Sequence, residues 1–341
     1  MMTEKERNTG IDLMRLIAAL MVVAIHTYPL ASLSETGDFL VTRVLCRVAV
    51  PFFFMVTGYY VLPGCLEIGK GSRKLAGWFR KTALLYGAAV LIYLPVNLYA
   101  GRLEGLTAGA VLRELLWNGT FYHLWYFPAA LLGMGLTVFL IRWLGMRKTV
   151  FAVLILYVAG LLGDSYYGAA VQAAPLKAFY EWLWQWMDYT RTGLFFAPVF
   201  LCLGLVLRKQ KPLSGKQSGI GTGICLGLML AEGMVLHRFS LQRHDSMYLL
   251  LLPAMYFLFS WVRTWRVPAF PKARQMSALI YLIHPLCIIA VRGVGGALGL
   301  RWLLVDNSLV HFAAVTASAA VLSAMPGILH RRKEALSDGE K

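Results

Sequence analysis

Two ionisable residues lie inside the first long apolar stretch of the sequence, residues 11–27, which reads IDLMRLIAALMVVAIHT. They are Arg15 and His26, eleven residues apart. In an α-helix that spacing is about three turns, so both side chains point to nearly the same face and lie about 16 Å apart along the axis. Ionisable groups in membrane helices usually face a protein interior or a water-filled cavity. The spacing therefore predicts an internal polar site lined by this helix.

A second interpretation gives these two residues a structural role only. The Arg15 side chain would extend to the lipid headgroups, and His26 would form a single packing hydrogen bond. For either residue alone the two interpretations are about equally good. The shared helix face and the further polar residues below favour a site.

Further candidates for this site lie in two other apolar stretches. The second stretch carries Arg43 and Arg47 one and two turns in from its outer end, and Arg47 is expected near the depth of His26. The ninth stretch holds His284 at mid-membrane depth, with Tyr281 almost one turn earlier. A neutral histidine can exchange a proton near pH 7, and an arginine can hold an anionic group. This set predicts either activation of a hydroxyl or binding of a small zwitterion's carboxylate.

The outer ends of other stretches add substrate-binding candidates. His123 and Trp125 occur in HLWYFP, at the outer start of the fourth stretch. Glu232, near the outer end of the seventh, and Asp245 in HDSMY could hold an ammonium group. Their alternative roles are a helix-end hydrogen bond for Glu232 and interfacial solvation for Asp245. No metal site is expected, because no two His, Cys or carboxylate residues have metal-ligand spacing on one helix.

Composition makes this chain an all-α integral membrane protein. Of its 341 residues 58% are hydrophobic and 15% charged, and the mean hydropathy is +0.62. Its five cysteines are scattered and form no disulfide pattern. Runs of about 20 apolar residues mark membrane-spanning helices. We predict ten spans in a single membrane domain covering residues 1–341, at about 11–31, 39–63, 78–100, 121–142, 149–163, 190–208, 218–236, 246–264, 275–292 and 308–330.

Basic residues indicate the topology of these spans. Of the 33 lysines and arginines, 22 fall in one alternating set of connections and termini and eight in the other, while Arg15, Arg43 and Arg47 lie within the first two spans. The positive-inside rule then places both termini in the cytoplasm. This distribution also accounts for the net charge of +16 without nucleic acid, because no soluble basic domain is present. The aromatic outer loop 164–189 is expected to form a short interfacial helix.

Several of these residues occur in patterns that resemble the acyltransferase-3 family of ten-helix membrane proteins. The patterns are Arg15 and His26 in the first span, RVAVPFFFMVTG from Arg47 to Gly58, HLWY and YLIH. The resemblance implies that His26 is the catalytic residue and that Arg15 and Arg47 help to place an acyl donor, commonly acetyl-CoA. Within the second pattern, Pro51 and Gly58 would permit a kink and a close approach between helices.

A more specific resemblance covers nearly the whole chain. The stretches RVAVPFFFM, GYYV, YHLWYFPA, GDSYYG, TRTGLFFAPVFLCLG, HDSMYL and YLIHPL resemble the membrane half of VanT-type serine racemases of vancomycin resistance. In that family a ten-helix domain precedes a cytoplasmic racemase that uses pyridoxal phosphate (PLP) to make D-Ser for altered peptidoglycan. The present sequence departs from the family by stopping after the tenth span. PLP is therefore expected only in a C-terminal domain absent from this chain.

Three functions are compatible with these observations, and all place the chain in a bacterial plasma membrane. The first is binding and uptake of L-serine for the cytoplasmic racemase domain. The second is transfer of an acyl group from acyl-CoA to a hydroxyl acceptor, with His26 as general base or acyl relay. The third is a membrane anchor. We rank them in that order. The expected partners are the lipid bilayer, L-serine or an acyl donor and acceptor, the racemase domain, and a second copy of the chain in a homodimer.

Overall fold

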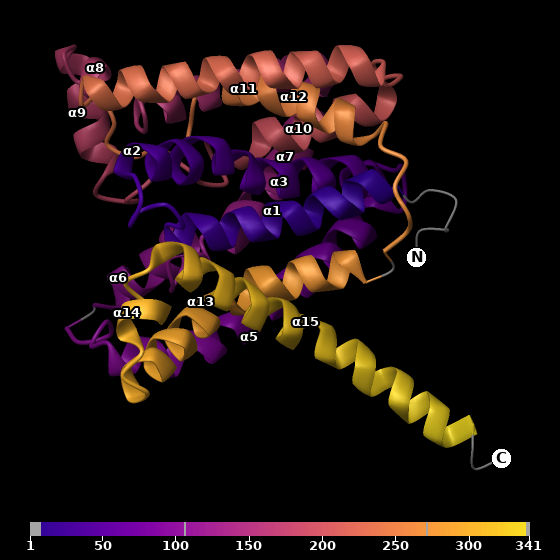
Figure 1. The fold of residues 1–341 in the computed structure, drawn as a ribbon. Helices are drawn as coiled ribbons and strands as arrows, with labels where there is room; N and C mark the ends of the chain where they lie inside the picture. The colour runs from indigo at the N-terminus through magenta and orange to yellow at the C-terminus, as the bar shows by residue number, and fades with distance from the viewer. Residues whose placement is uncertain (1–7, 106, 271, 339–341) are drawn as a thin grey trace. The chain divides into compact units, whose positions relative to one another are not determined.

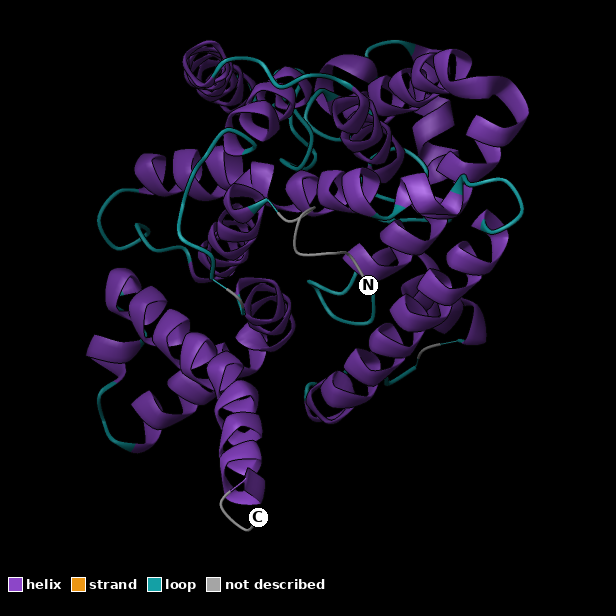
Figure 2. Ribbon diagram, turned by 90° about the vertical axis from the view of Figure 1, so that its right-hand side faces the viewer, coloured by secondary structure: helices purple, strands orange, loops and turns teal. Residues whose placement is uncertain are grey.

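The computed structural model describes residues 8–105, 107–270 and 272–338, with the backbone alone for residues 326–338. Lys5, Arg7 and Lys341, which contribute to the predicted cytoplasmic charge, lie outside the described residues. Every regular element in the described part is a helix (Figure 2). The longer ones are α1 (Thr9–Thr27), α3 (Ala49–Tyr60), α5 (Gly71–Tyr99), α7 (Tyr126–Leu162), α9 (Ala174–Leu183), α10 (Ala197–Lys209), α11 (Gly215–Arg238), α12 (Leu251–Val262), α13 (Ala273–Ala297) and α15 (Ser308–Asp338).

Helices that are long and apolar enough to cross a membrane lie where the sequence predicts spans. Among the described residues seven helices are long and apolar enough to cross a bilayer. They are Thr9–Thr27, Glu35–Tyr60, Gly71–Tyr99, Tyr126–Leu162, Gly215–Arg238, Ala273–Ala297 and Ser308–Met325. The helices α10 and α12 coincide with two further predicted spans but have only 13 and 12 residues. The all-helical membrane fold is confirmed, while the number of crossings and the side of the termini stay predictions.

One long helix contains two of the predicted spans. The helix α7 covers most of 121–142 and all but the last residue of 149–163, and it is interrupted at Gly145, where φ is 74° and ψ is 167°. Only glycine adopts this conformation without a steric cost from Cβ. This break falls between the two predicted spans, and the chain continues as helix on both sides of it.

The second span is irregular where its arginines lie. Between the short helix α2 (Glu35–Asp38) and α3, the chain forms a π-helical segment η2 (Phe39–Val44) and a 3₁₀ segment η3 (Leu45–Val48). Arg43 belongs to η2 and Arg47 to η3. Pro51 contributes to this irregularity, because it has no N–H to donate to the carbonyl of the residue four positions earlier. Such departures from α-helix often occur at functional sites.

The chain divides into two compact units, which we describe separately. The first unit consists of residues 1–50, 213–222 and 257–341. In it α1 packs along α13 and also contacts α15 and η3, while α13 packs along α15 (Figure 1). The face of α1 that meets these neighbours is rich in small residues, including Ala18, Ala19 and Ala24. Small side chains let helix axes approach closely, which is how membrane helices gain packing energy.

The second unit consists of residues 51–212 and 223–256 and is built around α7 and α10. The helices α3 and α10 cross at two facing glycines. A Cβ at Gly58 would overlap the carbonyl of Leu201, and one at Gly204 would overlap the carbonyl of Met55. The expected close approach at Gly58 is therefore confirmed, and its partner helix is α10.

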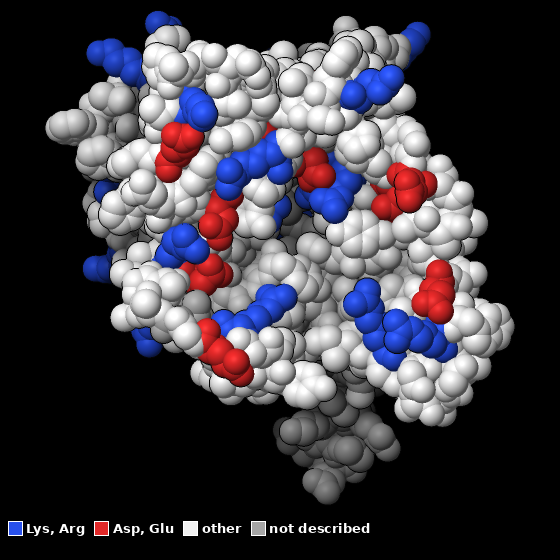
Figure 3. All heavy atoms as spheres, turned by 90° about the vertical axis from the view of Figure 1, so that its left-hand side faces the viewer, with Lys and Arg blue, Asp and Glu red and all other residues white. Residues whose placement is uncertain are grey.

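The outer surface of these helices is suited to lipid. Large apolar side chains are exposed along α5, α7 and α11, for example Leu84, Phe139 and Leu228. Figure 3 shows a different face, on which lysine, arginine and acidic side chains form small groups among uncharged ones. The helix α9 buries Tyr180 and Leu183 and exposes its other apolar side, as expected of an interfacial helix.

The Gly58 crossing gives a stability prediction. Replacing Gly58 by Ala should lower the free energy of unfolding by about 1–3 kcal/mol, because the added methyl group forces α3 away from α10. The measurement is the thermal unfolding midpoint of the purified protein in detergent. The matched control is Gly77→Ala on α5, where a Cβ meets nothing within 4 Å. Equal midpoints for Gly58→Ala and Gly77→Ala would contradict the packing argument.

Candidate functional site in the first helix

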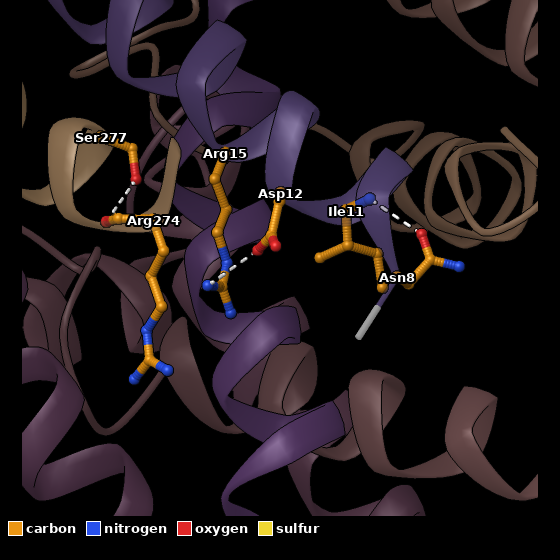
Figure 4. A network of polar contacts seen from close by, with 6 residues as sticks. All are labelled: Asn8, Ile11, Asp12, Arg15, Arg274 and Ser277. Atoms are coloured by element: carbon orange, nitrogen blue, oxygen red, sulfur yellow. Dashed lines mark hydrogen bonds and ion pairs between the residues drawn. The ribbon is translucent and has the colours of Figure 1, made fainter. Parts of the chain in front are cut away.

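The N-terminal turn of α1 holds a buried pair of opposite charges. Asn8 caps the helix, since its side-chain oxygen accepts a hydrogen bond from the Ile11 N–H at 3.0 Å. One turn on, Arg15 Nη1 lies 3.4 Å from Asp12 Oδ1, and their side chains are only 12% and 9% exposed (Figure 4). An acidic residue in the first turn is also favoured by the helix dipole. The pair presents a carboxylate and a guanidinium together in a mostly enclosed position.

A second guanidinium extends beside this pair from α13. In Figure 4 the Arg274 side chain, from the first turns of α13, points the same way as that of Arg15. Ser277 Oγ donates a hydrogen bond of 3.0 Å to the Arg274 carbonyl, within the same helix turn. This end of α1 and α13 is therefore rich in positive charge, as the positive-inside rule requires of a cytoplasmic end.

At the other end of α1, two histidines meet. His26 is in the last turn of α1, and its ring stacks on that of His284 from α13, with centroids 5.3 Å apart and planes 18° apart. His284 is fully buried, and its Nδ1 lies 2.8 Å from the Tyr281 carbonyl oxygen. A carbonyl only accepts hydrogen bonds, so Nδ1 carries the proton and Nε2 of the neutral ring keeps its lone pair. The Tyr281 side chain is 7% exposed and its ring centroid is 6.2 Å from that of His284.

Arg15 and His26, which the sequence predicts to line one polar site, form different contacts at the two ends of α1, and the shared site stays a prediction. On the face between them, Ala18, Ala19 and Val22 are 0%, 0% and 2% exposed. These small apolar side chains fill the contact between α1 and its neighbours. The Asp12–Arg15 pair and the His26–His284 pair are thus separate along the axis of α1.

The two arginines of the second span have different surroundings. Arg43 Nη2 donates to the Tyr28 hydroxyl at 3.2 Å, and its guanidinium lies over the Tyr28 ring, just beyond the end of α1. Arg47 lies on η3, which packs against α1, and its neighbour Cys46 shares a buried cluster with Ile25. Arg47 is therefore at the level of the last turn of α1, where His26 also lies.

Three predicted site residues belong to the second unit. His123 is 1% exposed and packed edge-on against the rings of Tyr93 and Phe121. Trp125 is 9% exposed. Glu232 accepts hydrogen bonds from the backbone N–H groups of Leu249 and Leu250, at 2.6 and 2.9 Å, and from the Tyr166 hydroxyl at 2.9 Å.

These contacts favour a structural role for Glu232. Its carboxylate satisfies the backbone donors that precede α12, which would otherwise lack partners at the helix start. The sequence offered a helix-end hydrogen bond as the alternative role of Glu232, and the structure contains hydrogen bonds of this kind. An ammonium ligand would have to compete with three hydrogen bonds already formed.

The loops of the second unit also form a cluster of buried polar side chains that the sequence did not predict. Asp164, fully buried, accepts hydrogen bonds through Oδ1 from the backbone N–H groups of Ser246 and Met247, at 2.7 and 3.0 Å. Arg191 Nη1 donates to Ser246 Oγ at 3.1 Å, and its guanidinium lies over the ring of Trp125 at 5.0 Å. The motifs GDSYYG, TRTG, HDSMYL and HLWY thus converge in one place.

Asp12 was missed as well, although a signal for it was present. It stands three residues before Arg15, the spacing at which opposite charges pair on a helix. For Asp164, Arg191 and Ser246 the only signal was their place in motifs already tied to a resemblance. Among the described residues no three His, Cys, Asp or Glu side chains are grouped as a metal site would require.

Two titratable groups of the loop cluster respond to pH in opposite directions. Burial, with the charges of Arg191 and Arg243, lowers the pKa of His244 to about 4. Its ring packs on Tyr189 with centroids 4.4 Å apart. Burial raises the pKa of Asp164 to about 6. As the pH falls from 7 towards 5, His244 binds a proton in the unfolded loop but not in the native loop, which destabilises the native loop. Over the same range Asp164 binds a proton in the native loop but not in the unfolded loop, which stabilises the native loop.

We therefore expect opposite pH responses from two variants of this cluster. His244→Gln leaves Asp164 as the titrating group, so protection of residues 239–250 from hydrogen exchange should rise between pH 7.5 and pH 5. Asp164→Asn leaves His244, so protection should fall over the same range. The measurement is hydrogen-exchange mass spectrometry corrected for the intrinsic pH dependence of exchange. The same pH response in both variants would show that these groups do not control the loop.

Comparison with known proteins shows the family to which this chain belongs. The acyltransferase-3 family model, described as an acyltransferase domain, matches residues 8–326. An amino-acid racemase of Enterococcus faecalis is 40% identical over 326 residues, covering 94% of this chain and 45% of the relative. A serine/alanine racemase of Enterococcus gallinarum is 38% identical over 319 residues, covering 91% of this chain and 44% of the relative.

A second amino-acid racemase of Enterococcus faecalis is 37% identical over 326 residues, covering 94% of this chain and 46% of the relative. The chain thus spans a little under half the length of the curated relatives it matches. No solved structure gives a significant match. The apolar helices and the bacterial relatives make this a multi-pass protein of a bacterial membrane. It resembles the membrane part of VanT-like racemases, and the chain belongs to the acyltransferase-3 family.

Proposed function

We propose that this membrane domain binds L-serine and carries it across the bilayer to a racemase domain on the cytoplasmic side. The relatives named amino-acid racemase and serine/alanine racemase support a substrate of this class. The observation that carries the proposal is the enclosed Asp12–Arg15 pair on α1. Racemisation itself is assigned to the partner domain, which would hold PLP.

The pair has the charges that a zwitterion needs. An amino acid presents a carboxylate and an ammonium a few ångströms apart, and neither charge is stable in an apolar environment alone. Arg15 would take the carboxylate in a two-pronged hydrogen bond, and Asp12 would take the ammonium. In the absence of ligand Arg15 and Asp12 face each other at 3.4 Å, which offsets part of the cost of burying the two groups.

The separation of the two polar contacts on α1 implies motion during transport. Ala18, Ala19 and Val22 close the face between the Asp12–Arg15 pair and the His26–His284 pair. A solute that passes from one contact to the other therefore requires α1 to shift against α13. The side chains at this contact are small and interdigitate little, so such a shift would meet little steric hindrance.

Acyl transfer is the second candidate function, and the His26–His284 stack favours it. His284 is fixed with its proton on Nδ1, so a neutral ring keeps a basic Nε2. In this reaction a nitrogen of the His26 imidazole, which stacks on the fixed ring of His284, takes the proton of an acceptor hydroxyl, whose oxygen attacks the thioester carbonyl of acyl-CoA. The C–S bond then breaks, and the CoA thiolate leaves and is protonated. Arg47, at the level of His26, would stabilise the negative charge that develops on the carbonyl oxygen.

Uptake of radiolabelled L-serine into proteoliposomes tests the first candidate. Uptake by the wild type should exceed that of empty vesicles, and Asp12→Asn or Arg15→Gln should reduce it by about tenfold or more, because each leaves one substrate charge unpaired. Excess L-serine should compete, whereas ethanolamine and lactate, which each lack one of the two charges, should compete poorly.

The matched control for this experiment is Glu67→Gln, which breaks an exposed ion pair with Lys74. It should leave uptake unchanged at equal reconstituted protein. If wild-type uptake does not exceed that of empty vesicles, serine transport is excluded.

Thioester chemistry tests the second candidate on the same purified protein. An acyltransferase should bind acetyl-CoA and release free CoA in the presence of a hydroxyl acceptor, and His26→Ala should abolish release, because the proton acceptor is lost. Lys177→Gln, which removes an exposed ion pair with Glu181 on α9, should retain most of it. Intact acetyl-CoA and no binding would exclude acyl transfer, and failure of both assays would leave the anchor.

A further inference from the structure

The first unit contains a cavity of about 250 Å³ lined by Arg292, Arg301 and Val305. Arg292 lies near the end of α13, and Arg301 begins the short helix α14 (Arg301–Leu304), which leads into α15. None of the residues proposed above for serine or acyl-CoA takes part in it. The cavity is therefore a separate feature with its own chemistry to explain.

The loop that forms the cavity is held in place by backbone contacts. Gly299 adopts a φ of 67°, which turns the chain back on α13, and the Leu300 N–H donates to the Gly295 carbonyl at 2.9 Å. The Leu304 carbonyl accepts a hydrogen bond from Nδ1 of the buried His311 at 2.7 Å, which ties α14 to α15. The two arginines thus project from a fixed scaffold.

The guanidinium groups retain most of their hydrogen-bonding capacity. Arg292 forms no hydrogen bond or ion pair with any residue in the described part of the chain. Arg301 Nε lies 3.9 Å from Asp306 Oδ1, and these side chains are 76% and 61% exposed, so this ion pair is weak. Each guanidinium offers five N–H donors in a planar fork that matches the oxygens of a phosphate group.

Several large apolar side chains are exposed on the segments that form the cavity or flank it in the chain. Large side chains on α13, α14 and α15 are 45% to 65% exposed, namely Ile289, Val294, Leu298, Trp302 and Leu309. Tryptophan with exposed aliphatic neighbours at the end of a membrane helix is typical of the zone between headgroups and acyl chains. A small water-soluble anion would make no use of this apolar surface, whereas a lipid would cover it.

We propose that this cavity binds the phosphodiester headgroup of an anionic phospholipid. Arg292 and Arg301 hold the phosphate oxygens in charge-assisted hydrogen bonds, and the acyl chains lie along the exposed side of α13. The topology predicted from the basic residues puts the 293–307 connection outside, so the lipid belongs to the outer leaflet. The inference is independent of the proposed function, because it concerns neither the Asp12–Arg15 pair nor the histidines.

The test measures the thermal unfolding midpoint of the full chain, purified in detergent, with added lipids. Phosphatidylglycerol should raise the midpoint of the wild type, and Arg292→Gln/Arg301→Gln should lose most of that shift, because ligand binding to the native state stabilises it. The matched control is Lys177→Gln/Arg238→Gln, which also removes two positive charges from predicted outer positions. It should keep the wild-type shift.

Three results would overturn the proposal. An equal shift in Arg292→Gln/Arg301→Gln and in the wild type would mean that the lipid acts elsewhere. A full shift with inorganic phosphate alone would identify a site for a small anion. An equal shift with phosphatidylcholine would mean that the acyl chains act without recognition of negative charge. Native mass spectrometry should show phosphatidylglycerol retained by the wild type and by the control, but not by the cavity variant.

Discussion

The burial of α1 against its neighbours is the constraint on which the candidate sites of the first unit depend. A membrane helix that carries Asp12, Arg15 and His26 is costly in lipid, and it becomes stable when protein covers its polar face. The helices α13 and α15 and the η3 segment provide that cover. Small residues such as Ala18 and Ala19 let helices approach closely, and at the end of α1 the ring of His284 from α13 stacks on that of His26.

The same requirement explains the organisation of the second unit. Asp164, in the loop after α7, and Glu232, in the last turns of α11, are used first to satisfy backbone donors. Asp164 and Glu232 each accept two backbone N–H groups, and each fixes the segment that leads into α12. A carboxylate that accepts two backbone hydrogen bonds in this way is part of the scaffold of the loops.

Family membership and geometry bear differently on function. The acyltransferase-3 match covers residues 8–326 and directs attention to His26, which the structure pairs with His284. The racemase relatives direct attention to amino acids, for which the Asp12–Arg15 pair has the appropriate charges. Both pairs lie on α1, one near each end. A single helix thus carries the groups for both candidate functions, and separate assays on its two ends distinguish them.

The sequence by itself determined the class of protein, the position of the apolar helices and several local features. Apolar runs and their basic flanks are properties of adjacent residues, so they could be recognised without coordinates. The close approach at Gly58 was accessible for the same reason. Only the tertiary structure decided which side chains meet. Three contacts illustrate this, because each joins residues that are far apart in the sequence or that lie on the two sides of a turn. They are the stacking of His26 on His284, the hydrogen bond from Arg43 to Tyr28 and the hydrogen bond from Ser246 to Asp164. Helical periodicity fixes the face of a residue, but the partner on that face depends on how the helices pack.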